Sequence, residues 1–265
     1  MESGGASPSP ASRISTPSSA TPKRTKICVY CGSSAGNGPA HVEAARALAR
    51  LMAAKNIALG KFPNILTDEN SMKLISLPTT VYGGGTVGLM GEVAKTLVSL
   101  SGPDSVHGII PEALVRYERD PTYTSKQLNG TDGKHLAVPE ESVFGRTTVV
   151  EDMHTRKRMM AQEVIEGGPG SGFIALSGGY GTVEELFETA TWNQLGIHNK
   201  GICVLNINGF YDGILTWINK SVEDGFIHGD NKRIVAEAKT AEEAIDALRD
   251  YKVSESVYKL SWGKE

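Results

Sequence analysis

The sequence lacks any uninterrupted apolar stretch long enough to cross a lipid bilayer as a helix. It contains only three cysteines in 265 residues, an odd number that argues against a disulfide framework and favours a reducing compartment. Its formal net charge is −3, whereas general nucleic-acid and membrane-surface binders carry a basic excess. We therefore expect a cytoplasmic protein with no membrane and no nucleic acid among its partners.

Signatures of metal-dependent and cofactor-dependent classes are also missing. Cys28 and Cys31 form a CxxC, but residues three apart on one strand point to opposite faces, which disfavours a redox or metal pair. His135, His154 and His198 follow no metal-ligand spacing. The chain has no Walker motif, no complete dinucleotide fingerprint and no Gly-x-Ser-x-Gly elbow. We expect neither a metal nor a hydride-transfer cofactor.

The composition predicts one globular unit with tails. Apolar residues make up 40% and charged residues 22%, which is typical of a globular protein with a core. Residues 1–25 are rich in Ser, Pro and Ala, which predicts a disordered tail. A mitochondrial presequence is the weaker alternative, because prolines disfavour the amphipathic helix that a presequence needs. Residues 26–252 form the predicted single domain, and residues 253–265 form a C-terminal tail.

Apolar runs of strand length alternate with segments of helical periodicity along this domain. Strands are predicted at 26–31, at 57–59 and 81–82 (one strand, interrupted), and at 106–110, 172–176, 202–205 and 234–235. Helices are predicted at 41–54, from the glycine-rich stretch 83–91 to residue 100, and at 149–166, 183–192, 211–223 and 241–248. The polar stretch 117–145 is expected to be a long loop near a site. This alternation predicts an α/β, Rossmann-like, doubly wound parallel sheet flanked by helices.

Residues 60–80 interrupt an apolar run that is otherwise continuous. Without them, Asn56 to Leu59 would join Val81 and Tyr82 in one buried strand. Insertions are tolerated at loop tips rather than inside strands, so this position is physically unusual. Two interpretations remain: a translated intron, or a genuine surface insertion with the strand shifted to Thr79–Tyr82.

Two glycine-rich loops, at 83–91 and 178–182, each follow a predicted strand and open a helix. Such loops present backbone N–H groups and a positive helix end to a phosphate, and Thr182 is expected to cap the second helix. Together they predict one ligand at the carboxyl ends of neighbouring strands, although glycine loops also serve packing alone. Glu184 and Glu185 stand close to that anion, which indicates a nucleotide handled at its sugar. The alternative is that these acids only favour the helix dipole.

A basic run lies on the helix predicted at 149–166. Arg156 and Lys157 have no acid four residues later to balance them, because Met160 and Ala161 occupy those positions. A functional cationic site is one interpretation, and a solvated basic face is the other.

Five motifs follow one another along the chain: CGSS at 31–34, VYGGGTVGLMG at 81–91, DMHTRK at 152–157, GGYGTVEE at 178–185 and TWNQLGIH at 191–198. Together they resemble the LONELY GUY family of cytokinin riboside 5′-monophosphate phosphoribohydrolases, once labelled lysine decarboxylases. The resemblance covers roughly residues 26–251. It implies a homodimer without metal or coenzyme that cleaves the N-glycosidic bond of N6-substituted AMP, with AMP itself as a further candidate substrate.

The resemblance also implies roles for individual residues. Arg156 and Glu185 are the implied catalytic pair: Glu185 stabilises the oxocarbenium-like ribose and orients or deprotonates the attacking water, and Arg156 hydrogen-bonds the leaving purine. The glycine-loop N–H groups hold the 5′-phosphate. The expected substrate-binding residues are Glu118, Lys157, Gly84, Gly85, Gly178, Gly179, Tyr180, Gly181, Thr182, Glu184 and Thr191.

The chain departs from the family pattern at two places. Ser177 stands where the family's loop usually has proline, which is expected to loosen the loop slightly without removing an N–H donor. The 119–146 stretch is longer than in compact members. A non-catalytic nucleotide or molybdenum-cofactor carrier of the same fold is the alternative function, but Arg156 and Glu185 favour the enzyme. A pyridoxal-dependent decarboxylase needs a Schiff-base lysine and a pyridinium partner, and no stretch supplies a convincing pair.

Overall fold

The computed structural model describes residues 23–58, 79–115 and 138–258, together with residues 260 and 262. The expectations for the tail at 1–22, for Glu118, and for most of the 60–80 and 117–145 segments therefore lie outside the described residues.

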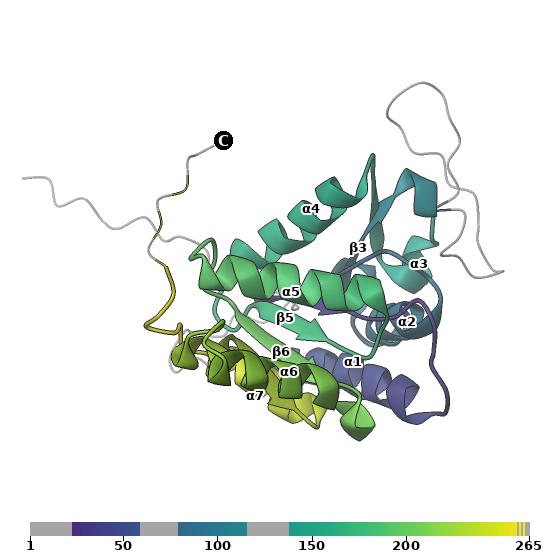
Figure 1. The fold of residues 1–265 in the computed structure, drawn as a ribbon. Coiled ribbons are helices and arrows are strands. Elements are labelled where there is room, and N and C mark those ends of the chain that lie inside the picture. Colours follow the sequence, from purple (N-terminus) through teal and green to yellow (C-terminus); the bar gives the residue numbers. More distant parts are fainter. Residues whose placement is uncertain (1–22, 59–78, 116–137, 259, 261, 263–265) are drawn as a thin grey trace, which may run out of the picture.

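A seven-stranded parallel sheet forms the centre of the molecule (Figure 1). Its strands are β1 (Lys26–Tyr30), β2 (Thr79–Tyr82), β3 (Val106–Pro111), β4 (Arg146–Val150), β5 (Gly172–Ala175), β6 (Gly201–Leu205) and β7 (Val235–Ala238). Their order across the sheet is β4-β3-β2-β1-β5-β6-β7, and every pair is parallel. The chain winds outward from β1 to β4, returns to place β5 beside β1, and winds outward again. This confirms the predicted doubly wound α/β fold.

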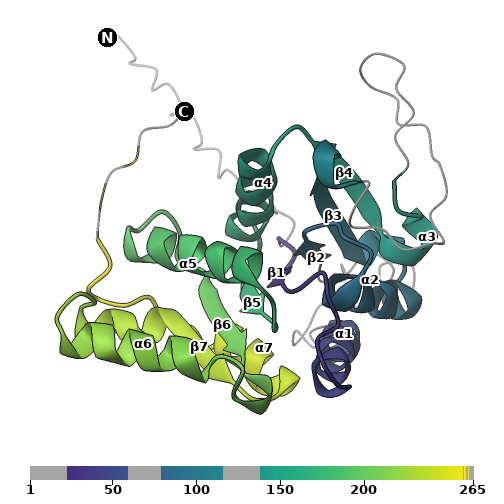
Figure 2. The ribbon, with the colours of Figure 1, turned by 45° about the vertical axis from the view of Figure 1, so that its right-hand side comes forward.

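Helices cover both faces of the sheet (Figure 2). One face packs against α1 (Ala40–Ala58), α2 (Gly88–Ser101) and α7 (Ala241–Arg249), and the other against α4 (Met153–Ile165), α5 (Tyr180–Gln194) and α6 (Asp212–Glu223). A short helix, α3 (Glu141–Phe144), precedes β4. Single 3₁₀ turns lie at Pro103–Ser105, Glu112–Leu114, Ile207–Gly209 and Gly229–Ile234.

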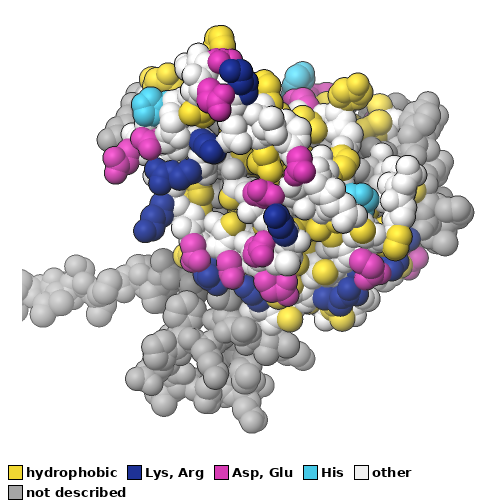
Figure 3. All heavy atoms as spheres, turned by 60° about the horizontal axis from the view of Figure 1, so that its bottom comes forward, with side chains coloured by type: hydrophobic (Ala, Val, Ile, Leu, Met, Phe, Trp, Pro, Cys, Tyr) yellow, Lys and Arg dark blue, Asp and Glu magenta, His cyan; other side chains and the backbone are white. Residues whose placement is uncertain are grey.

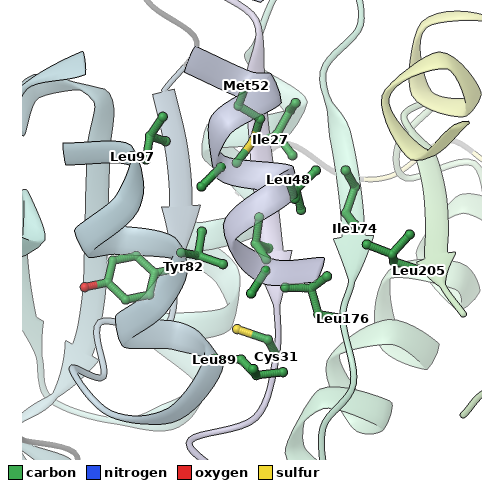
Figure 4. Close-up of a cluster of buried hydrophobic side chains, with 14 of the residues drawn as sticks. Ile27, Cys31, Leu48, Met52, Tyr82, Leu89, Leu97, Ile174, Leu176 and Leu205 are labelled. Atoms are coloured by element: carbon green, nitrogen blue, oxygen red, sulfur yellow. The ribbon is translucent and has the colours of Figure 1, made fainter. Parts of the chain in front are cut away.

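The alternation of side chains along β1 divides the core into two layers. Ile27 and Val29 point to the α1 and α2 side, where Leu48 and Met52 of α1 pack over the strands (Figure 4). Cys28 belongs to the opposite layer, whereas Cys31 belongs to the layer beneath α1. The two thiols therefore lie on opposite faces, as the sequence predicts. All three cysteines are free and buried.

The second strand does not start where the sequence suggests. Ile57 and Ala58 belong to the last turn of α1, and the strand is Thr79–Tyr82. Helix α1 continues through Ala58, and the β-branched residues Thr79, Thr80 and Val81 form the strand instead. The strand thus occupies the shifted position of the surface-insertion interpretation, while residues 60–78 lie outside the described part.

The helix predicted at 149–166 begins later, at Met153, because a strand occupies its expected first turn. Arg146–Val150 pair with β3 as edge strand β4, and four β-branched residues in a row explain this preference. Asp152 then caps α4, since its Oδ1 accepts the N–H of Thr155 at 2.8 Å.

Charges of both signs are interspersed over the face that forms the bottom of Figure 1, as Figure 3 shows. Lys55 of α1 pairs with Asp246 of α7 at 3.0 Å, and Arg249 contacts the same carboxylate at 2.7 Å. Within the described ranges, no helix is both long and apolar enough to cross a membrane.

Candidate functional site

Three loops meet at the carboxyl edge of the sheet, where the strand order reverses between β1 and β5. The N–H of Gly32, after β1, donates to the carbonyl of Ser177, after β5, at 3.0 Å. The N–H of Leu89, in the first turn of α2, donates to the carbonyl of Gly32 at 3.0 Å. The two glycine loops therefore do not follow adjacent strands, because the loop after β1 lies between them and joins them. Ligands of doubly wound sheets bind at this kind of crevice.

The N-terminus of α5 points its unpaired N–H groups into this crevice. The helix starts at Tyr180, and its N-cap is Gly179, which has no side chain to cap it. Thr182 lies inside the first turn, so the expectation that it caps the helix is wrong. The loop also packs closely, because a Cβ on Gly178 would lie 2.1 Å from Oγ1 of Thr182. The uncapped helix end leaves backbone donors for an anion.

Arg156 of α4 is almost fully buried, with 6% of its surface exposed. Its guanidinium lies directly over Gly83, where a Cβ would be only 1.7 Å from Nη2. Its Nε finds no hydrogen-bond partner within the described part of the chain, and its Nη1 contacts Sδ of Met153 at 3.7 Å. Burying a cation with an unsatisfied donor costs free energy, so Arg156 is a candidate for a functional role.

Glu185 of α5 is also buried, with 8% of its surface exposed, and shares a cavity of about 350 Å³ with Arg156. The cavity is lined by Cys31, Gly32, Ser33, Met90, Leu114, Met153, Arg156, Gly179, Tyr180, Gly181, Thr182, Glu184 and Glu185. One cavity thus combines a guanidinium, a buried carboxylate and the donor end of a helix. This combination can hold an anion and stabilise charges of both signs on a reacting molecule.

Two buried groups beneath this cavity respond to its charges. Burial raises the pKa of the Cys28 thiol well above its ordinary value, the carboxylate of Glu185 raises it further, and Arg156 lowers it. Burial also raises the pKa of Tyr30, with Cys28 and Glu185 adding to the effect. The charges of Glu185 and Arg156 therefore both act on Cys28 of β1, although the two side chains come from different helices.

Lys157 faces α5 rather than the cavity. Its Nζ bonds to Glu184 at 2.5 Å and to Glu188 at 3.2 Å. Burial lowers the pKa of Lys157, but the hydrogen bonds to these two carboxylates outweigh it and raise the pKa. Lys157 therefore joins α4 to α5 and neutralises acids beside the site. The expected contact of Lys157 with substrate remains a prediction.

The other expected residues divide between the cavity and its surroundings. Gly179, Tyr180, Gly181, Thr182 and Glu184 line it. Gly84 is instead buried against β3 with φ +74°, so that a Cβ would lie 2.9 Å from Cβ of Ile110, and Gly85 is buried as well. Thr191 is exposed farther along α5, and its hydroxyl donates to the carbonyl of Phe187 at 2.8 Å. Gly84, Gly85 and Thr191 are therefore not among the residues that line this cavity, and their expected contact with substrate remains a prediction.

The sequence pattern does not predict that some of the lining residues belong to the site. Met90 and Met153 come from the starts of α2 and α4, and Leu114 follows β3. Together they give the cavity an apolar wall that suits a flat base. Met90 belongs to a recognised motif, and Met153 directly precedes the basic run, but only the fold brings them together. Among the described residues, no group of three or more His, Cys, Asp or Glu is placed to hold a metal.

A second cavity of about 500 Å³ adjoins the first on the other side of the glycine loop. The two share Gly32, Ser33 and Gly179. The wall of the second cavity also includes Gly178, Ser177 and His41.

Comparisons of the sequence with known proteins agree with this picture. A family model described as "Possible lysine decarboxylase" matches residues 90–248. A bifunctional cytokinin biosynthesis protein of Fusarium pseudograminearum is 50% identical over 227 residues, which are 86% of this chain and 40% of that protein. A cytokinin riboside 5′-monophosphate phosphoribohydrolase of Arabidopsis thaliana is 36% identical over 239 residues, or 89% of each chain. The chain thus spans less than half of the Fusarium relative but most of the Arabidopsis one.

Two solved structures share the fold at low sequence identity. The molybdenum cofactor binding protein from Rippkaea orientalis gives a TM-score of 0.50 and 16% identity, over 84% of this chain and 94% of that one. The Moco carrier protein from Chlamydomonas reinhardtii gives a TM-score of 0.50 and 15% identity, over 86% and 96%. These likenesses show the fold alone.

Proposed function

Because the chain belongs to the LONELY GUY family of cytokinin riboside 5′-monophosphate phosphoribohydrolases, we propose that it cleaves the N-glycosidic bond of N6-substituted AMP. The products are the free base, which is the active cytokinin, and ribose 5-phosphate. The observation that carries this proposal is the meeting of Arg156, Glu185 and the uncapped start of α5 in one cavity of about 350 Å³.

The 5′-phosphate binds at the N-terminus of α5. The first N–H groups of this helix have no intrahelical acceptor, and the helix dipole favours a dianion there. Gly179 and Gly181 have open space where a Cβ would stand, so a phosphate can approach the backbone closely. A nucleoside without phosphate loses these contacts, which explains a preference for the monophosphate.

Glu185 stabilises the reacting sugar. It lies about one turn beyond Gly181 on the same helix, so a phosphate held at the helix start places the ribose near its carboxylate. Cleavage of the N-glycosidic bond builds positive charge on the ribose, and a buried carboxylate stabilises that charge strongly. The same carboxylate orients or deprotonates the water that attacks the anomeric carbon.

Arg156 acts on the leaving base. The purine gathers negative charge as the bond breaks, and the guanidinium of Arg156, which lines the cavity, donates a hydrogen bond to a ring nitrogen. Arginine does not deprotonate at neutral pH, so its contribution is electrostatic and positional. Met90 and Met153 pack against the face of the base.

A carrier function is the weaker alternative. The Arabidopsis relatives that match most of this chain are named phosphoribohydrolases, whereas the carrier-like structures share the fold at only 15–16% identity. AMP itself is a second candidate substrate, because none of the proposed contacts involves the N6 substituent.

The protein is proposed to act as a homodimer in the cytoplasm. Large aromatic side chains are exposed at the start of α5 and on and beyond α6: Tyr180 is 98% exposed, Phe226 84% and Trp217 53%. Aromatic side chains are enriched at protein–protein interfaces, which supports this proposal. Three free cysteines support a reducing compartment. Sedimentation analysis of the protein and of Trp217→Asp tests the dimer, since a monomeric wild type contradicts it.

Release of free base from N6-isopentenyl-AMP, AMP and N6-isopentenyladenosine tests the activity. We expect cleavage of the monophosphates and at least a hundredfold lower rate on the nucleoside. Glu185→Gln should keep its melting temperature and nucleotide binding while losing about a hundredfold or more in turnover. Glu223→Gln, an exposed glutamate on α6, is the matched control. No base release by the wild type, or near-normal turnover in Glu185→Gln, would contradict the proposal.

A further inference from the structure

Ser177 occupies the position directly before Gly178 and Gly179, where the family's loop usually has proline. It is buried, and its hydroxyl shares a hydrogen bond of 2.8 Å with Nδ1 of His41, in the first turn of α1. The two residues are 136 positions apart in the sequence. Its carbonyl accepts the N–H of Gly32, so Ser177 is tied on two sides.

His41 is itself held in place. Its ring meets Phe210 edge-on, with ring centroids 5.8 Å apart. On another side lies the turn at Gly36, where a Cβ would be in ordinary van der Waals contact with the imidazole, at 3.4 Å. These residues all line the second cavity, beside the glycine loop. The imidazole is therefore an anchor on a packed wall rather than a freely rotating surface group.

We infer that His41 is a positioning residue that fixes the phosphate-binding loop through Ser177. This inference rests on the function proposed above. Proline restricts the backbone of such a loop by its ring, which fixes φ near −65°. Serine lacks that restriction, and the bond between Ser177 and His41 supplies it from outside the loop.

The inferred constraint acts on binding of the phosphate. Gly178 and Gly179 are the residues with the most backbone freedom to lose when the loop closes on a ligand. A loop already held at Ser177 loses less of that freedom on binding. Because the phosphate contacts the enzyme equally in the ground state and the transition state, the effect falls on KM rather than on kcat.

The test is a double-mutant cycle with a restoring variant. Ser177→Ala removes the hydroxyl, and His41→Phe removes Nδ1 while keeping an aromatic ring beside Phe210. Each should raise KM for N6-isopentenyl-AMP about fivefold, the usual worth of one net hydrogen bond, and leave kcat within twofold. The double variant should be no worse than either single one. Ser177→Pro should have a KM near the wild-type value, and adding His41→Phe to the Ser177→Pro variant should leave that KM unchanged.

A matched control exists elsewhere in the chain. The hydroxyl of Ser256 shares a hydrogen bond of 2.8 Å with Nδ1 of His228, away from both cavities. Ser256→Ala should leave KM and kcat unchanged. Melting temperatures are recorded for every variant, because a purely structural bond would lower the melting temperature without moving KM.

Two results would overturn the inference. One is unchanged KM in both Ser177→Ala and His41→Phe, and the other is an equal effect of His41→Phe in the Ser177→Pro background. The dissociation constant of ribose 5-phosphate, measured by calorimetry in the same variants, should rise in parallel with KM. If the wild type binds ribose 5-phosphate but turns over no substrate, the proposed function fails while this binding cycle still decides the role of His41.

Discussion

Replacing Gly83 with alanine should inactivate the protein without unfolding it. A Cβ at this position would lie 1.7 Å from Nη2, 2.8 Å from Cζ and 3.2 Å from Nε of Arg156. Ordinary van der Waals contact begins near 3.4 Å, so the guanidinium must move by the difference, 1.7 Å at Nη2. The atoms that it meets are the far end of a flexible side chain, and Gly83 has no positive φ, so the backbone can stay in place.

The magnitude follows from this displacement. A misplacement of about 1 Å in a catalytic group can cost on the order of a hundredfold in rate, and loss of one charge-stabilising donor costs about a hundred- to a thousandfold. We therefore expect kcat on N6-isopentenyl-AMP to fall by about a hundredfold or more. The melting temperature should change by only a few degrees, because no core contact is lost.

Two other glycine-to-alanine substitutions serve as controls. Gly84→Ala meets Cβ of Ile110 at 2.9 Å and sits at φ +74°, so it should lower the melting temperature strongly as well as activity. Gly213→Ala on α6 has open space around its Cβ and should change neither activity nor fold adversely. Base release and thermal unfolding are measured side by side. A Gly83→Ala protein with near-normal turnover would refute the placement of Arg156 at the reacting bond.

Three further outcomes follow from the charges. Lys157→Ala should raise KM severalfold, because it leaves two carboxylates of α5 uncompensated beside the anion site. Salt screens this repulsion, so the increase should be largest at low salt, and a KM of the variant that does not change with salt would contradict the prediction. Burial raises the pKa of Glu163, but hydrogen bonds from His107 and Lys26 outweigh it and bring the pKa to about 2, so stability should fall as pH drops from 4.5 towards 2. The free energy of unfolding should fall by roughly 3 kcal/mol at most over this range, and denaturation measurements on Glu163→Gln should not show this fall. Burial lowers the pKa of His198 to about 4, so stability should also decline between pH 6.5 and 4, and NMR should show a neutral His198 ring at pH 5.5.

The sequence by itself determined the fold class and the two residues at the centre of the proposed chemistry. Strand-length apolar runs and helical periodicity are read in short windows, so they predict the alternation that builds a doubly wound sheet. The motifs around Arg156 and Glu185 are equally local. The start of β2 was misplaced and β4 was not predicted at all, because β-branched residues beside an insertion, and between an expected loop and an expected helix, form these two strands.

Only the tertiary structure decided which residues face one another. Arg156 lies over Gly83, 73 positions earlier, and Ser177 meets His41 across 136 positions. Lys157 contacts the acids of α5, whereas its neighbour Arg156 lines the cavity. Gly84 packs against β3, and Thr191 lies on the exposed surface of α5. These outcomes depend on the order of strands across the sheet and on the rotation of each helix about its axis. Both are set by long-range packing, which no short window of sequence contains.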